Sequence, residues 1–191
     1  MKNHDSIKKT IEQLTFHHVK RGFFLLNQIS DQHGMRSLWL RELQRLDLTV
    51  TFKQGRSCAI GEGGYDYRAN RPLLRFRMSF FLEQPNSNDM LFPEYKFLRN
   101  REDIGSCRGD LSTVVAALCA HECAHVFQFW IIKMRESMKL DPEAKLFGFN
   151  LKDTRDGHGD LWRYVYSTLR MSWINNLPTY KYVPPSAHPK V

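Results

Sequence analysis

The chain has 191 residues, of which 42% are hydrophobic and 25% charged, and its formal net charge is +8. This length and composition predict one globular domain with a sizeable core and exclude a disordered or low-complexity chain. The sequence contains no run of about 18 apolar residues and no signal-peptide pattern, so we expect neither a membrane span nor secretion. We therefore expect a soluble protein of the cytoplasm, or of the nucleus or nucleoid.

The positive charge is spread along the chain, and the segment 111–150 is neutral. An excess of basic residues suits a polyanionic partner such as nucleic acid. It equally suits a solvated surface that keeps the protein soluble. Charge alone leaves both interpretations open.

The first part of the chain predicts helices. Residues 6–29 carry apolar side chains at helical spacing, with Asp5 or Ser6 as the N-cap. A second, shorter helix is expected within residues 36–46. Residues 1–35 are therefore expected to form an N-terminal helical segment.

The next part predicts a sheet. Alternating and β-branched residues indicate three strands, within residues 46–52, 57–67 and 72–82. The sequence GEGG at 61–64 has neither the lysine nor the following helix of a phosphate loop, so it indicates a bulge or a close backbone approach. Residues 83–109 read as a loop.

The C-terminal half predicts two more helices. A long helix begins at Asp110, with Asp110 or Ser112 as its N-cap, and ends at Pro142 at the latest. Residues 145–157 read as a loop, and residues 159–173 as a helix. The tail, 176–191, is rich in proline and is expected to be extended.

The long helix carries the pattern HECAH at residues 121–125. Residues four apart share one helical face, so His121 and His125 can direct one ring nitrogen each at a common metal ion. Zinc binds such nitrogens at about 2.0–2.1 Å. Glu122 then lies beside the metal, where its carboxylate can act as a general base toward an activated water. Burying these three groups in an apolar helix without partners is costly, which argues against a chance match.

A catalytic zinc site needs a third protein ligand and an open position. Glu136 lies about three turns further along the same helix, too far to reach the metal, whereas Glu143 in the following loop is an alternative. The stronger candidate is His158, because Gly157 and Gly159 allow the backbone to approach a crowded centre. The next helix can then hold its ring.

Cys119 and Cys123 lie four apart, on the side of the long helix opposite the histidines. The chain has four cysteines and no C-x-x-C pair, which favours small core residues over a metal or redox site. For the donor that stabilises an oxyanion, Tyr164 and Tyr166 are open candidates.

The motifs HECAH and GHGDLWRYVYSTL, in this order and each associated with a helix, resemble the SprT-like, or Spartan-type, metalloprotease family. The resemblance covers roughly residues 36–175. It implies an α+β, zincin-like metalloprotease domain with helices packed on a small antiparallel sheet. It also implies that His121, His125 and His158 bind zinc. The catalytic base would then be Glu122, and the substrates would be proteins associated with DNA.

Two features depart from this family. The segment 126–157 between the motifs is long, and is a candidate lid or specificity insert. The cysteine-rich zinc ribbon of many relatives is missing, so DNA binding is expected from the domain itself. Candidate residues are Arg68, Arg71, Arg75 and Arg77 on the hairpin, or Lys8, Lys9, Lys20 and Arg21 on the first helix. Either group can also be a solvated charged face.

The sequence thus predicts a zinc-dependent endopeptidase that acts on a protein substrate, with DNA as a candidate partner. The main alternative interpretation is a non-proteolytic, zinc-containing module that binds nucleic acid or protein. Such a module has no use for Glu122, and a structural zinc would need a fourth ligand, for which His188 or a cysteine is the candidate. A metal-dependent hydrolase of a non-peptide bond is a third interpretation.

Overall fold

The computed structural model describes residues 2–32, 36–53, 61–83, 88–92, 94, 98, 104–137, 145–146, 149–150 and 157–173. Its helices are α1 (Lys2–Gln32), α2 (Arg36–Leu43), α3 (Ser79–Leu82), α4 (Leu111–Ser137) and α5 (Asp160–Trp173). Its strands are β1 (Asp47–Thr51), β2 (Gly61–Asp66), β3 (Arg71–Arg77), β4 (Met90–Phe92), β5 (Cys107–Gly109), β6 (Lys145–Leu146) and β7 (Phe149–Asn150). This mixture of helices and small sheets confirms the predicted α+β class. The predicted tail, 176–191, lies outside the described residues.

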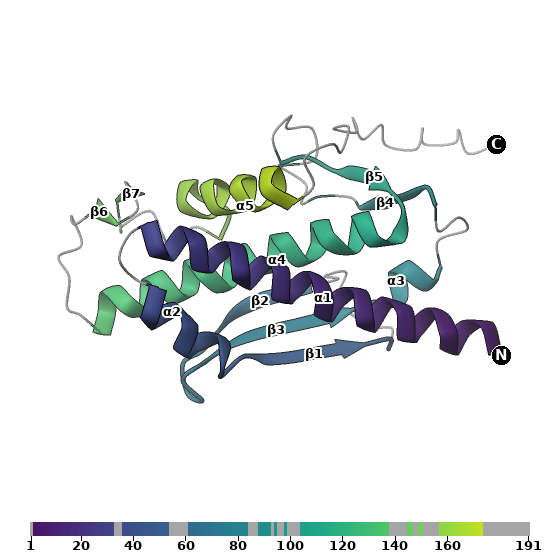
Figure 1. The fold of residues 1–191 in the computed structure, drawn as a ribbon, viewed down its shortest axis with the longest axis horizontal. Helices are drawn as coiled ribbons and strands as arrows, with labels where there is room; N and C mark the ends of the chain where they lie inside the picture. Colours follow the sequence, from purple (N-terminus) through teal and green to yellow (C-terminus); the bar gives the residue numbers. More distant parts are fainter. Residues whose placement is uncertain are drawn as a thin grey trace, which may run out of the picture.

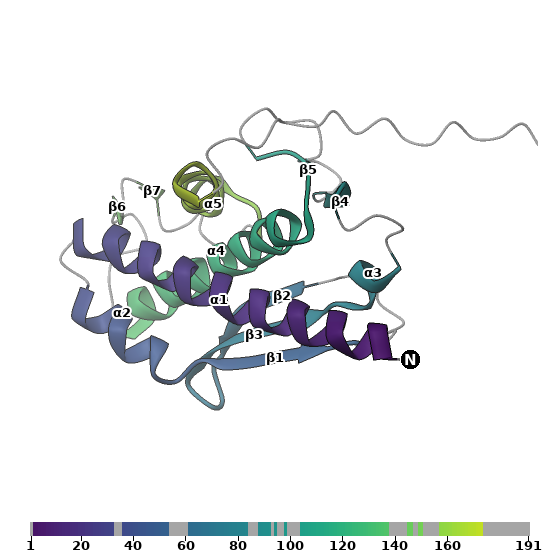
Figure 2. The same ribbon diagram turned by 45° about the vertical axis from the view of Figure 1, so that its right-hand side comes forward.

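The helix α4 runs through the centre of the fold, with α5 on one side and the main sheet on the other (Figures 1 and 2). Of the two predicted caps, Asp110 is the one that caps it, because its Oδ1 accepts the backbone N–H of Thr113 at 2.8 Å. Every residue from 114 to 124 is buried, including Cys119 and Cys123, which confirms their predicted place in the core. By length and composition α4 is apolar enough to cross a membrane, but 89% of its apolar window is buried, as in a core helix.

The helix α1 packs along α4 and shares its core. Ile11, Val19 and Phe23 recur at helical spacing and are buried in one cluster with the apolar residues of α4. Trp39 of α2 extends this contact, since its ring lies 5.0 Å from those of both Phe23 and Trp130. The N-terminal helix is therefore joined to the rest of the fold through the core.

The main sheet is mixed, so the prediction of an antiparallel sheet was wrong in part. The strand order is β1-β3-β2, with β2 antiparallel to β3 and β1 parallel to it. Leu74 and Phe76 of β3 are almost fully buried, in keeping with the central position of this strand. It thereby separates β1 from β2, its neighbour in the sequence.

The predicted strand at 72–82 ends early, at Arg77, and gives way to the short helix α3. Met78 and Phe81 are both buried, and a spacing of three brings them to one side of a helical turn. In a strand they would point to opposite faces. The segment predicted as a loop, 83–109, contains the paired strands β4 and β5. Strands of three residues are too short to show an alternating pattern.

Candidate functional site

Three histidines meet beside the middle of α4. The Nε2 atom of His121 lies 3.2 Å from Nε2 of His125 and 3.4 Å from Nε2 of His158. His158 lies two residues before Asp160, the first residue of α5. The three ligand atoms all lie within 4.8 Å of one another. His121 is buried, whereas His125 and His158 are half-buried, so the cluster opens toward solvent on their side. As predicted, these three side chains are placed to hold a metal ion.

Trp162 of α5 packs against all three imidazole rings. Its ring centroid lies 4.8 Å from that of His121, 5.2 Å from that of His125 and 4.6 Å from that of His158. Trp162 is fully buried and follows His158 by one helical turn. The sequence analysis missed this residue, although an aromatic side chain four positions after a candidate ligand is a signal that could have found it.

Gly157 does not have the predicted role of admitting a crowded backbone. It is exposed, and a Cβ atom placed on it would meet no described atom within 4 Å. His158 is instead held by the first turn of α5, where the carbonyl of Gly159 accepts the N–H of Arg163 at 2.9 Å. The contact with Trp162 adds to this support.

A buried carboxylate meets the other ring nitrogen of His121. Oε1 of Glu94 lies 2.8 Å from Nδ1 of His121, and the side chain of Glu94 is only 1% exposed. An N–H on Nδ1 would have no acceptor in line with it among the described residues, so this is a close charge contact and not a straight hydrogen bond. Burial lowers the pKa of His121, but the negative charge of Glu94 outweighs this effect, so the pKa is raised. Sequence reasoning missed Glu94, which lies in the segment predicted as a loop.

Tyr166 belongs to this buried cluster and not to an open site. Its hydroxyl donates to Oε2 of Glu94 at 2.6 Å, and the side chain is fully buried. It is therefore not placed to stabilise an oxyanion on a substrate. Tyr164, the other candidate, is 36% exposed and lies on the face of α5 opposite Trp162.

Glu122 points toward strand β2, where two glycines make room for it. Its carboxylate accepts a hydrogen bond from the backbone of Gly63, and burial raises its pKa to about 7. A Cβ atom on Gly61 would lie 2.6 Å from Cδ of Glu122, and one on Gly63 would lie 2.8 Å from the backbone carbonyl carbon of Glu122. Both distances are too short for real atoms. The GEGG sequence is thus a close backbone approach, one of the two alternatives that the sequence indicated.

Gly63→Ala is expected to destabilise the fold by about 1–3 kcal/mol, because the added methyl group overlaps the backbone of a central helix that cannot move aside. The control is Gly64→Ala, whose Cβ atom would meet only the ring of Phe129, at an ordinary 3.7 Å. Urea unfolding of the two variants measures the difference. Equal free energies of unfolding would contradict the close packing of β2 on α4.

The four arginines named for DNA binding lie away from the histidines. Arg71, Arg75 and Arg77 alternate along β3 with buried residues, so they share the outer face of the sheet, opposite α4. Arg68 is exposed in the turn before β3. Arg71 pairs with Asp47 at 2.9 Å and Arg75 with Glu62 at 3.8 Å, which reduces the positive charge of this face.

Two alternative metal ligands, Glu143 and His188, lie outside the described residues, and so does Cys58. Glu136 is described and is exposed near the end of α4. No family model, curated protein or solved structure matches this chain.

Proposed function

We propose that this protein is a zinc-dependent endopeptidase of the SprT-like type, with a zincin-like fold. The main observation is that the ring nitrogens of His121, His125 and His158 converge. The buried Glu122 follows His121 directly on helix α4. In a zincin-like arrangement, α4 is the active-site helix and β2 is the strand that runs beside it.

The spacing of the nitrogens supports zinc as the metal. Ligands about 2.0–2.1 Å from a tetrahedral zinc ion lie about 3.3–3.4 Å from one another. The Nε2 atoms of His125 and His158 lie 3.2 Å and 3.4 Å from Nε2 of His121. Nitrogen ligands with this spacing suit zinc better than magnesium or calcium, which prefer oxygen ligands.

Glu122 is the residue proposed to move the proton. Zinc, when bound, would polarise a carbonyl group and lower the pKa of water, so that water can attack this group as hydroxide near neutral pH. The carboxylate of Glu122 takes the proton from the attacking water and passes it to the leaving amine. Burial raises the pKa of Glu122 to about 7, so this carboxylate binds a proton more readily than an exposed glutamate does.

Strand β2 is proposed to hold the substrate. Among the described strands it pairs with β3 alone, so its other edge is available for an extended peptide. This is the strand whose glycines contact Glu122. A peptide added along this edge would bring its backbone close to the catalytic carboxylate.

The rival interpretation, a zinc module without activity, fits less well. Structural zinc sites are almost always closed by four protein ligands. Among the described residues the cluster has three, and two of these are half-buried. Such a module would also have no need for a buried glutamate beside the ligands.

The proposed activity is tested by incubating zinc-loaded protein with casein and with a histone. We expect fragments of both on a denaturing gel, and their loss when 1,10-phenanthroline removes the metal. Intact substrates, or cleavage that the chelator leaves unchanged, would overturn the proposal.

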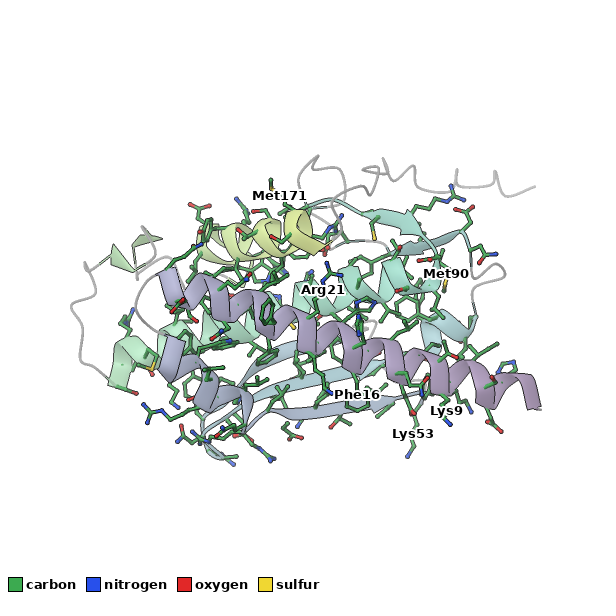
Figure 3. The ribbon with its side chains drawn as sticks, in the orientation of Figure 1. Lys9, Phe16, Arg21, Lys53, Met90 and Met171 are labelled. Atoms are coloured by element: carbon green, nitrogen blue, oxygen red, sulfur yellow. The ribbon has the colours of Figure 1, made fainter. Side chains whose placement is uncertain are left out.

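We further propose that the substrates are proteins bound to DNA. The support is the formal charge of +8 and a hollow on the outer face of the sheet. Its lining residues are Thr49, Thr51, Gly61, Glu62, Arg75, Phe76 and Arg77. A second basic group, which includes Lys9 and Arg21, lies along α1, and Lys53 projects from the end of β1 (Figure 3).

Arg75→Glu/Arg77→Glu is expected to flatten the dependence of DNA affinity on salt, because phosphate contacts release counterions. Zinc content should not change. Fluorescence anisotropy with single- and double-stranded DNA measures this, and Lys8→Glu/Lys9→Glu is the comparison that tests α1. If the wild-type protein retains no DNA at about 50 mM salt, where phosphate contacts are strong, the DNA proposal is wrong.

A further inference from the structure

The proposed metal centre has a support that lies outside both histidine motifs. The ring of His121 has two nitrogens, and Nε2 faces the Nε2 atoms of His125 and His158. The remaining nitrogen, Nδ1, lies 2.8 Å from Oε1 of Glu94. The carboxylate thus contacts the histidine on the side opposite the metal position.

Glu94 is itself fixed from several directions. Its second oxygen accepts the hydroxyl of Tyr166 at 2.6 Å, and its backbone N–H donates to Oγ of Ser106 at 3.0 Å. Arg170 donates to the same tyrosine oxygen at 2.9 Å and to the carbonyl of Gly105 at 3.2 Å. Every side chain in this network is nearly or fully buried. A rigid network of this kind leaves the carboxylate little freedom to turn away from His121.

Burying the negative charge of Glu94 costs free energy unless neighbouring groups compensate it. A carboxylate that is 1% exposed loses its hydration, and such groups occur where ion pairs and hydrogen bonds replace the water. Here a cation, Arg170, is linked to it through one tyrosine hydroxyl. The other oxygen lies 2.8 Å from Nδ1 of His121, where its negative charge favours a proton on Nδ1 and a free lone pair on Nε2.

We infer that Glu94 is a positioning residue for the metal centre, and that with Tyr166 and Arg170 it holds His121 in the tautomer and orientation that ligate zinc. The inference rests on the proposed function, because it needs a metal at the three histidines. Glu94 lies far from both histidine motifs in the sequence, so neither motif contains it. Carboxylate partners of this kind typically change metal affinity by about 10–100-fold.

The test is a comparison of zinc affinities, measured by competition with a fluorescent chelator. Glu94→Gln keeps the shape and can still accept from Tyr166, but its amide N–H₂ would then face Nδ1 and favour the wrong tautomer. We expect its zinc dissociation constant to rise about 10–100-fold. Tyr166→Phe is the matched variant, because it removes the two hydrogen bonds of the tyrosine hydroxyl, with Glu94 and with Arg170, and leaves the Glu94 contact with His121 in place. We expect a smaller rise for it.

The outcomes separate the two claims. A wild-type protein that binds no zinc overturns the proposed function and this inference together. Wild-type binding with an unchanged constant for Glu94→Gln overturns the inference alone and leaves Glu94 a purely structural residue. If Glu94→Gln does not fold, ¹⁵N spectra of the histidines in the metal-free wild type decide: protonation of His121 at Nδ1 supports the inference, and protonation at Nε2 overturns it.

Discussion

Replacing Glu122 by glutamine is expected to abolish protein cleavage while the protein keeps its zinc. The amide has the same shape and its oxygen can still accept the hydrogen bond from Gly63, so the fold and the histidines should be undisturbed. It cannot take a proton, and loss of a general base lowers the rate by about 10²–10⁴-fold. The measurement is the rate of casein cleavage together with the zinc content of each preparation.

Glu136→Gln is the matched control for this experiment. It makes the same chemical change on the same helix, at an exposed position near the end of α4. We expect wild-type rates from it. If Glu122→Gln cleaves casein as fast as this control, Glu122 is not the general base. A module that only binds its partner is then favoured.

Replacing His158 by alanine is expected to raise the zinc dissociation constant by at least about a hundredfold. Residues that only support a ligand contribute about 10–100-fold, and His158 is proposed to be a ligand itself. Its Nε2 atom lies 3.4 Å from that of His121, so its removal leaves two nitrogens of the three. Cleavage should be lost in parallel with zinc.

Two further variants make this result specific. His4→Ala removes an exposed histidine on α1 and should bind zinc like the wild type. Glu143→Ala tests the alternative third ligand that the sequence left open. Loss of zinc from Glu143→Ala, with normal binding by His158→Ala, would show that the third ligand is wrongly assigned.

The parts of the structure that the sequence predicted correctly are local. The cap of α4 at Asp110, its buried run and the shared face of His121 and His125 all follow from helical spacing within a few residues. His158 was found because its motif is also short and is followed by a helix. Each of these features depends on neighbours in the sequence.

The parts that were missed or wrong depend on distant segments. The parallel pairing of β1 with β3 joins residues far apart in the sequence, such as Asp47 and Leu73, and no local pattern reports it. Glu94 precedes His121 by 27 residues and lies in a segment without periodicity, so nothing near it marks a partner for a histidine. The arginines of β3 were named as candidates for DNA binding, and strand alternation directs them to the face of the sheet opposite α4.

Titration of zinc into the metal-free protein, with casein cleavage followed at each addition, tests the central claim most directly. The proposed site predicts no cleavage without metal, and a linear rise that ends at one zinc per chain. The same titration of Glu122→Gln should show equal binding and no cleavage. Cleavage by the metal-free wild type, or a chain that holds one zinc at the three histidines and cleaves neither casein nor histone, would contradict the assignment of this protein as a zinc endopeptidase.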